Sequence, residues 1–211
     1  MSTRPSAPVS SRKQPKQARS NDLVAAILDA AVQVLTTEGA QRFTTARVAE
    51  RAGVSVGSLY QYFPNKAAIL FRLQSDEWRT TRDQLRLILE DRTKPPLERV
   101  RSLVHFFIRS ECEEAAIRGA LNDAAPLYRD APEAVQIRAA SAQIFRSFLR
   151  EVLPNASEGT LALVGDLLKT TVSEVGSSFS ETPRSPAEIH AYADALADMV
   201  GAYLERLMAS R

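Results

Sequence analysis

Cysteine and histidine are scarce in this sequence, which limits the chemistry open to the protein. The 211 residues include one cysteine, Cys112, and two histidines. A lone cysteine cannot close an internal disulfide, and a structural zinc site would lack its usual ligands. We therefore expect no metal and no cofactor, and the composition fits a reducing compartment.

Motifs typical of enzymes are also absent. The sequence has no phosphate-binding glycine loop, no CxxC pair and no HExxH segment. The nearest pair of catalytic residue types, His105 and Cys112, is separated by seven positions. That separation is about 10 Å along one helix, which is too far for a hydrogen bond. The sequence therefore predicts that the protein is not an enzyme.

Long apolar runs are missing too. No run approaches the ~20 apolar residues of a membrane helix, and the N-terminus has no apolar signal segment. The chain is nevertheless 45% hydrophobic, which is enough to bury a substantial core. We expect a soluble, cytoplasmic protein that makes no contact with a membrane.

Positive charge is concentrated at the N-terminal end. Residues 1–72 contain ten Lys or Arg against four acidic residues, a net charge of +6, although the whole chain carries only +2. Such an excess suits phosphate neutralisation on DNA, but it also occurs on solvated surfaces. Residues 1–19 hold five basic side chains and no acid. We expect a disordered basic arm there, which either follows DNA or simply adds solubility.

Residues 43–66, FTTARVAERAGVSVGSLYQYFPNK, predict two short helices joined by a tight turn. Thr44 or Thr45 can cap the first helix, and Gly53 suits the positive φ at its end. Ser55 can cap the second helix, which the next proline terminates. The pattern is typical of a helix-turn-helix, although a plain helical hairpin in an all-α domain fits the spacing alone.

The second short helix is predicted to have one buried and one exposed face. Leu59 and Phe63 fall on the inward side together with Val54. A helix of about two turns is unstable alone, so its neighbours must hold it while it presents small and polar groups to a partner. The residues expected to face outward are Val56, Gly57, Ser58, Tyr60, Gln61 and Tyr62.

The segments TTARVA, AGVS and GSLYQYFPNK resemble the DNA-binding signature of the tetracycline-repressor (TetR) family of bacterial transcription regulators. The resemblance runs without gaps over roughly residues 20–73, about a quarter of the chain. It implies a DNA-binding function on an all-α fold. The residues whose positions match DNA contacts in the family are Thr45, Arg47, Ser58, Tyr60, Tyr62 and Lys66.

Side-chain chemistry refines these expected contacts. Gln61 can address an adenine edge, and Arg47 can pair with a guanine or a phosphate. Tyr60, Tyr62 and Lys66 are better suited to phosphates, which position the protein without reading sequence. The predicted DNA-binding set is Thr45, Arg47, Ser55, Val56, Gly57, Ser58, Tyr60, Gln61, Tyr62 and Lys66.

The rest of the chain is predicted to be helical. A helix at 20–38 forms the third wall of a three-helix domain, and a long helix capped by Asn65 runs to about Asp91. No strand pattern or repeat occurs. The expected fold is all-α, with a helix-turn-helix domain at 20–66 and a larger helical domain at 67–211 for ligand binding and dimerisation. Prolines delimit further helices at about 96–118, 119–128, 132–153, 158–179 and 186–208.

The last two predicted helices carry broad apolar faces and small residues. They could be core helices of a monomer, yet a palindromic operator read by helix-turn-helix units requires a two-fold dimer. The resemblance also implies a four-helix dimer interface here. The predicted interface residues are Leu161, Val164, Leu168, Val172, Phe179, Tyr192, Leu196, Met199 and Tyr203.

The middle helices place aromatic and polar side chains within apolar runs, which favours a small-molecule pocket. A purely structural role fits the same residues, and for His105 a satisfied core or interface histidine is the stronger alternative. The pocket candidates are Trp78, His105, Phe106, Arg109, Cys112, Tyr128 and Phe145.

These features together predict a sequence-specific, ligand-responsive transcription regulator, and repression is the family's commonest outcome. It would bind an inverted-repeat operator as a homodimer at the nucleoid, and an unidentified small molecule in its C-terminal domain would release it. The alternative is a helical protein-interaction module that lacks sequence-specific DNA binding.

Overall fold

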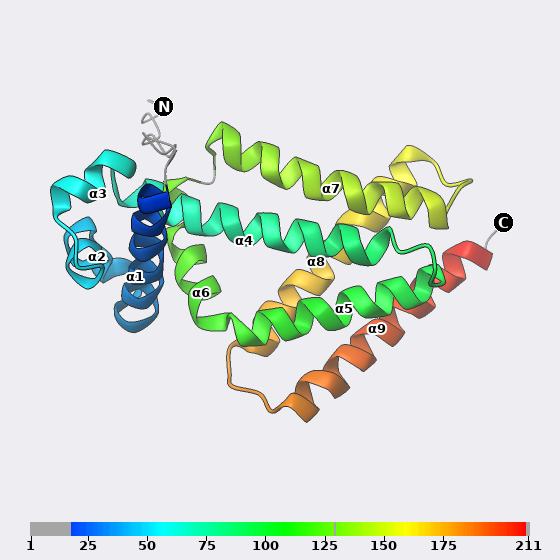
Figure 1. Cartoon of the computed structure of the whole chain (residues 1–211). Coiled ribbons are helices and arrows are strands. Elements are labelled where there is room, and N and C mark those ends of the chain that lie inside the picture. Colours follow the sequence, from blue (N-terminus) through cyan, green and yellow to red (C-terminus); the bar gives the residue numbers. More distant parts are fainter. Residues whose placement is uncertain (1–17, 129, 210–211) are drawn as a thin grey trace, which may run out of the picture. The chain divides into compact units, whose positions relative to one another are not determined.

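The computed structural model describes residues 18–128 and 130–209, and within these ranges every regular element is helical (Figure 1). The all-α prediction is confirmed. The predicted basic arm lies outside the described residues except for Ala18 and Arg19, which begin the first helix. The helices are α1 (Ala18–Arg42), α2 (Thr45–Arg51), α3 (Val56–Tyr62), α4 (Lys66–Leu89), α5 (Pro96–Glu113), α6 (Ala115–Ala124), the 3-10 turn η1 (Ala125–Leu127), α7 (Pro132–Val152), α8 (Glu158–Ser180) and α9 (Pro186–Ala209).

The helices pack as two compact units. Among the described residues, the first unit contains the chain up to Arg79 together with Ala116–Ile137, and the second contains Thr80–Ala115 together with the chain from Arg138 onward. Helices α4 and α7 each contribute one end to each unit. The unit that carries the helix-turn-helix therefore extends beyond the predicted 20–66 segment, because α6 and the first half of α4 bury apolar side chains in the same core.

The core of the first unit draws on α1, α2, α3 and the start of α4. Phe43 follows α1 and is fully buried. Complete burial of a side chain of this kind contributes about 1.5–3 kcal/mol. Packing, more than intrinsic helix propensity, therefore stabilises the seven-residue helices α2 and α3. Other core side chains are Ile27, Ala31, Val34, Leu35, Val48, Ala49, Leu59, Phe63, Ile69 and Leu70.

Helix α1 differs from its prediction at its start, whereas a break occurs at Gly39, directly after the predicted end at residue 38. It begins at Ala18, before the expected start at residue 20, and it is interrupted at Gly39, where φ is 77° and ψ is 169°. Glycine adopts this conformation without a steric penalty, and the helix then continues to Arg42. By length and composition, Ser20–Arg42 could cross a membrane, contrary to the expectation that no segment could. Its apolar stripe is nevertheless part of the buried core of the first unit.

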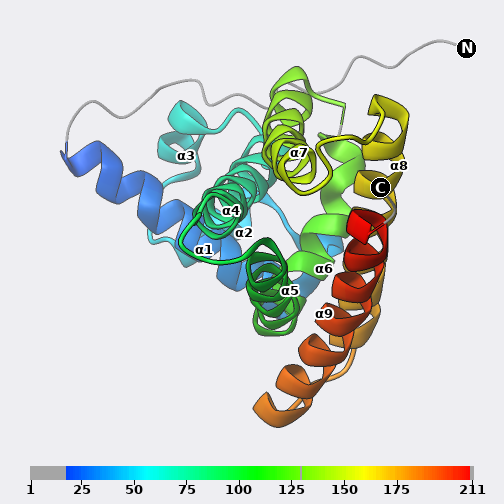
Figure 2. The same cartoon turned by 90° about the vertical axis from the view of Figure 1, so that its right-hand side faces the viewer.

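The second unit is organised around α5, which packs along α9 and against α8 (Figures 1 and 2). A close approach occurs at Gly176 of α8, where an added methyl group would lie 2.9 Å from Cε1 of Phe107. The expected use of small residues for close helix packing is visible at this position. The buried core includes Leu89, Val100, Val104, Ile108, Phe148, Leu149, Leu161, Val164, Leu168, Leu196, Val200 and Leu204.

Helix α5 ends earlier than predicted. The sequence indicated a helix to Arg118 and a break at Gly119, whereas α5 ends at Glu113 and Gly119 lies inside α6. The last turn of α5 is rich in glutamate, with Glu111 and Glu114 beside Glu113. Acidic side chains are unfavourable at the negative end of a helix dipole, which favours a break here. Helices α4, α7, α8 and α9 begin and end within two residues of their predicted limits.

Candidate nucleic-acid interface

Helix α2 is held at both ends by contacts that its own sequence supplies. Thr44 is the N-cap, and its Oγ1 accepts a hydrogen bond from the Arg47 backbone N–H at 3.3 Å. Val48 and Ala49 are buried, and Gly53 follows the helix with a φ of 66°. A side chain would be strained at that φ, so glycine permits the tight turn toward α3.

Helix α3 is fixed in a similar way. The Ser55 hydroxyl oxygen accepts a hydrogen bond from the Ser58 backbone N–H at 3.0 Å, and the two hydroxyl oxygens lie 2.8 Å apart. Leu59 and Phe63 are 0% and 1% exposed. Phe63 has extended backbone, as expected for a residue that precedes proline. The helix is therefore capped at its start and anchored along one face, with the opposite face exposed.

The exposed face of α3 carries four of the residues predicted to meet DNA. Val56 is 39% exposed and Tyr60 is 40% exposed, while Gly57 and Gln61 are also exposed. These residues stand at positions i, i+4, i+1 and i+5, so they share one side of the helix. Ser58 is half-buried beside them. The row presents an apolar group, a phenol and an amide, and the glycine leaves room for close approach to a groove.

Tyr62 corrects the prediction that it faces outward. Its side chain is only 5% exposed, and its hydroxyl lies 3.0 Å from Oγ of Ser20 on α1. Helical geometry explains the difference, because Tyr62 stands three positions after Leu59 and next to Phe63 and so shares their inward face. Tyr62 therefore ties the C-terminal end of α3 to α1.

Two side chains of α2 border the exposed face. Thr45 Oγ1 lies 3.1 Å from the hydroxyl oxygen of Tyr60, and the guanidinium of Arg47 pairs with Glu38 of α1. The Arg47 side chain remains 43% exposed. Exposed ion pairs contribute only about 0–1 kcal/mol, so Arg47 can exchange Glu38 for a phosphate at little cost.

The start of α4 adds a possible phosphate contact. Asn65 Oδ1 accepts a hydrogen bond from the Ala68 backbone N–H at 2.9 Å, which is the predicted cap. Lys66 is exposed at the first position of the helix. The positive end of the helix dipole and a lysine both favour an anion at this point.

The seven residues predicted to line a ligand pocket are divided between the two units. Tyr128 is 1% exposed, and its hydroxyl lies 3.0 Å from the carbonyl oxygen of Leu121 and 3.3 Å from Oε1 of Gln74. Burial raises the pKa of the Tyr128 hydroxyl. Tyr128 is thus a core residue whose polar group is satisfied. Trp78 shares its unit, whereas His105, Phe106, Arg109, Cys112 and Phe145 lie in the other.

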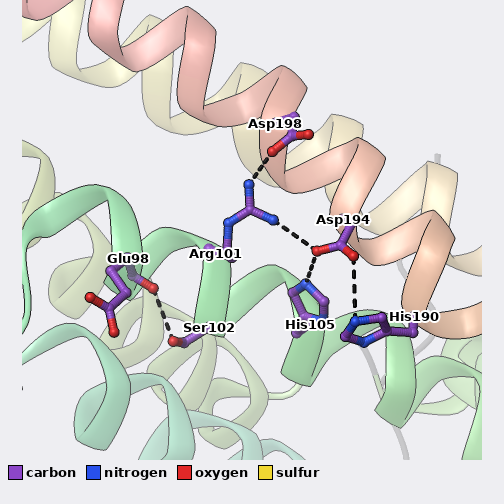
Figure 3. Close-up of polar contacts among 7 residues, drawn as sticks. All are labelled: Glu98, Arg101, Ser102, His105, His190, Asp194 and Asp198. Carbon is purple, nitrogen blue, oxygen red and sulfur yellow. Dashed lines mark hydrogen bonds and ion pairs between the residues drawn. The ribbon is translucent and has the colours of Figure 1, made fainter.

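His105 takes part in a polar cluster between α5 and α9 (Figure 3). Its Nε2 lies 3.0 Å from Oδ1 of Asp194, and Nε2 of His190 lies 3.4 Å from the other oxygen of the same carboxylate. Arg101 donates to Asp194 at 2.8 Å and also pairs with Asp198. A helix–helix contact therefore accounts for His105, which is the structural alternative that the sequence had favoured.

Four residues predicted at a dimer interface are buried in the core of the second unit. Leu161, Val164 and Leu168 of α8 are 2%, 1% and 6% exposed, and Leu196 of α9 is 5% exposed. They pack in one cluster with α5, which leaves them no surface for a second subunit. Of the others, Met199 is 52% exposed, and Val172, Phe179, Tyr192 and Tyr203 are half-buried.

The residues predicted at the dimer interface did not include the exposed apolar side of α8. Leu163 is 67% exposed and Leu167 is 47% exposed, and the two stand one helical turn apart. Because α8 carries leucines on two sides, periodicity alone could not separate the core face from the outer one. The only available signal was that α8 holds more leucines than one core-facing stripe requires.

Two family matches together cover most of the chain. Residues 27–73 match bacterial regulatory proteins of the tetR family, and residues 95–207, more than half of the chain, match a tetracyclin repressor-like C-terminal domain. Nucleoid occlusion factor SlmA of Vibrio campbellii is 40% identical over 83 residues. That alignment spans 39% of this chain and 42% of SlmA, less than half of the relative.

Solved structures resemble the chain over most of its length. The fatty acid degradation regulator FadR from Bacillus halodurans has a TM-score of 0.66 at 17% identity, covering 89% of this chain and 97% of that one. NalD, the secondary repressor of the MexAB-OprM multidrug efflux pump in Pseudomonas aeruginosa, has a TM-score of 0.63 at 19% identity, covering 87% and 96%. At such identities the likeness concerns the fold alone. With its helix-turn-helix and its C-terminal helices both matched, the chain belongs to the TetR family of DNA-binding bacterial regulatory proteins.

Proposed function

We propose that this regulator binds an inverted-repeat operator as a homodimer, with α3 of each subunit in the major groove, and that a small molecule releases it. The observation that carries the proposal is the exposed row of α3, which is held by the Ser55 cap and by the buried Leu59. A face that is ordered before DNA arrives loses little conformational entropy on binding.

Base reading falls to the exposed face of α3. Gln61 is positioned to make a bidentate contact with an adenine, and Val56 is an apolar partner for a thymine methyl group. Arg47 reads a guanine or holds a phosphate, while Tyr60 and Lys66 contact phosphates and set the register. Tyr62 supports these contacts from within by bonding Ser20. Thr45, Ser55, Gly57 and Ser58 complete the contact surface.

The dimer interface is assigned to the outer sides of α8 and α9. Leu163, Leu167 and Met199 are large apolar side chains that are about half exposed or more in the single chain. Large apolar side chains that remain exposed in a single chain are typical of a surface that a second copy covers. A two-fold dimer would supply one α3 helix for each half of an inverted repeat.

Effector binding is assigned to the second unit. Helix α4 contributes residues to both units, since its chain passes from the first to the second after Arg79. A ligand that prefers one arrangement of this helix would shift the spacing of the two α3 helices, and only its difference in affinity between conformers can do so. We assign the protein to the bacterial cytoplasm, where it associates with the nucleoid.

Selection from random DNA duplexes, followed by sequencing, tests this function. Purified full-length protein should recover an inverted repeat at moderate salt and lose it as salt rises, because phosphate contacts release counterions. Recovery of no consensus by folded protein would overturn the proposal and favour the protein-interaction alternative.

A further inference from the structure

An open depression on the second unit is not used by the function proposed above. It has a volume of about 580 Å³ and is lined by Arg92, Gln143, Arg146, Ser147, Arg150 and Glu151. The α7 residues at 143, 146, 147 and 150 follow the spacing of one helical stripe, so their side chains share a face.

A smaller depression of about 360 Å³ continues this surface. It shares Arg92, Ser147 and Glu151 with the first one and adds the apolar side chains of Ile144 and Phe148. Glu90 also lines it, but Glu90 faces Arg86 of α4 at 3.8 Å. The combined surface therefore has an arginine-rich part and an apolar wall.

The negative charge of Glu151 is balanced by a buried arginine, Arg99. Arg99, whose side chain is 2% exposed, pairs with Glu151 and donates to the carbonyl oxygen of Leu89. The hydrogen bond from Arg99 holds the pKa of Glu151 below its usual range. Glu151 is 36% exposed and lines both depressions, so its charge lies at the surface, but its ion-pair partner is the buried Arg99.

The remaining arginines exceed the acids that face them. Arg146 and Arg150 share a single carboxylate, that of Glu158 on α8, in ion pairs that are more than half exposed. Each guanidinium has five N–H donors, so both retain donors for another acceptor. Arg92 is exposed and makes no side-chain hydrogen bond or close ion pair among residues 18–128 and 130–209, although its charge attracts the Glu151 carboxylate and helps to lower the pKa of that group.

We propose that this depression binds a phosphate-bearing small molecule through Arg92, Arg146 and Arg150. Guanidinium groups bind phosphate oxygens through paired, charge-assisted hydrogen bonds, and Gln143 and Ser147 add neutral donors on the same stripe. The volume lies within the range of small-molecule sites. Three arginines face the carboxylates of Glu158 and Glu151, and Glu151 is also paired with Arg99, so the excess positive charge favours a multiply charged phosphate over a ligand with a single carboxylate. The site shares no residue with the α3 surface that is proposed to read DNA.

Calorimetric titration of full-length protein with sodium tripolyphosphate at low ionic strength tests the proposal. Wild type should show saturable binding, and the Arg92→Gln/Arg146→Gln double variant should bind at least about tenfold more weakly, since two charge-assisted bonds are removed. Arg138→Gln is the matched control, because Arg138 is an exposed arginine of α7 outside the depression. It should change the affinity less than twofold. Thermal unfolding verifies that each variant is folded.

Three results would overturn the proposal. Wild type that shows no saturable heat up to several millimolar would leave these arginines as a solvated ion-pair surface. Equal weakening by Arg138→Gln would reveal only general charge attraction. Citrate binding as tightly as tripolyphosphate would exclude a phosphate-selective site. Operator affinity should be unchanged in the double variant, and a loss there would instead identify a DNA-contacting surface.

Discussion

Helices α3 and α8 both begin with a serine N-cap, but they depend on this cap to different degrees. Ser55 caps α3 and Ser157 caps α8, each accepting a hydrogen bond from the backbone N–H three residues ahead, at 3.0 and 3.1 Å. Helix α3 has seven residues, whereas α8 has 23 and packs along much of its length. In the short helix nearly every residue either anchors the backbone or faces outward. The function of α3 can therefore be inferred from its own residues, whereas the role of α8 depends on partners that are distant in the sequence.

The largest effect is expected from charges placed on the outer face of α8. Leu163→Asp combined with Leu167→Asp should dissociate the homodimer and weaken operator binding by about 100-fold or more, because buried unpaired carboxylates are costly in an apolar interface. Sedimentation and fluorescence anisotropy measure both quantities. Leu87→Asp on α4 is the control, since Leu87 is 66% exposed. A double variant that remains dimeric would place the interface elsewhere.

The next effect concerns the packing of α8 against α5. Gly176→Val should lower the free energy of unfolding by about 1–3 kcal/mol, because its methyl groups would overlap the ring of Phe107. Gly119→Ala in α6 is the matched change, and no atom lies within 4 Å of the added carbon. It should raise stability by about 0.5–1 kcal/mol through helix propensity. Chemical denaturation measures both, and a stabilised Gly176→Val would contradict the packing.

The serine N-caps of α3 and α8 allow the two helices to be compared directly. Ser55→Ala and Ser157→Ala should each remove about 1 kcal/mol of cap energy. Only Ser55→Ala should weaken operator binding, by about fivefold, since the cap holds the whole of α3 in its binding geometry. Ser157→Ala should lower stability and leave DNA affinity within about twofold. Equal losses of affinity in both variants would remove the distinction drawn between α3 and α8.

A smaller effect on stability is expected when the pH is lowered. Because Arg99 holds the pKa of Glu151 below its ordinary value of 4.5, ionised Glu151 stabilises the folded state above that value and loses this contribution as pH falls through the lowered pKa. The stability difference between wild type and Glu151→Gln should be constant near neutral pH and shrink below about pH 4.5. Denaturation curves across this range measure it. A difference that grows toward acid would contradict the ion pair.

The sequence predicted the recognition unit better than the remainder because short-range rules govern it. The caps of α2, α3 and α4, the positive φ of Gly53 and the burial of Phe43 and Leu59 each follow from a residue and its near neighbours. Tyr62 was misplaced although its spacing from Leu59 puts it on the inward face, because its hydroxyl suggested an outward position and its partner Ser20 lies 42 positions away.

The helix limits of the second unit were largely predicted, but its packing was not, for the opposite reason. Leu161 and Leu163 are two leucines of α8 that the sequence pattern does not distinguish. Only the packing against α5 shows that Leu161 is buried and Leu163 is exposed. The pairing of Arg99 with Glu151 spans 52 positions, and that of His105 with Asp194 spans 89. Contacts at such separations leave no periodic signal in a single sequence.

The central claim is that the exposed face of α3 reads bases, and one measurement addresses it most directly. Random-duplex selection should be repeated with Gln61→Ala and compared with wild type. The account predicts that the inverted repeat and its spacing persist while preference is lost at one or two base pairs in each half-site, worth about 1–3 kcal/mol per lost contact. An unchanged consensus would contradict the assignment of α3 as the recognition helix.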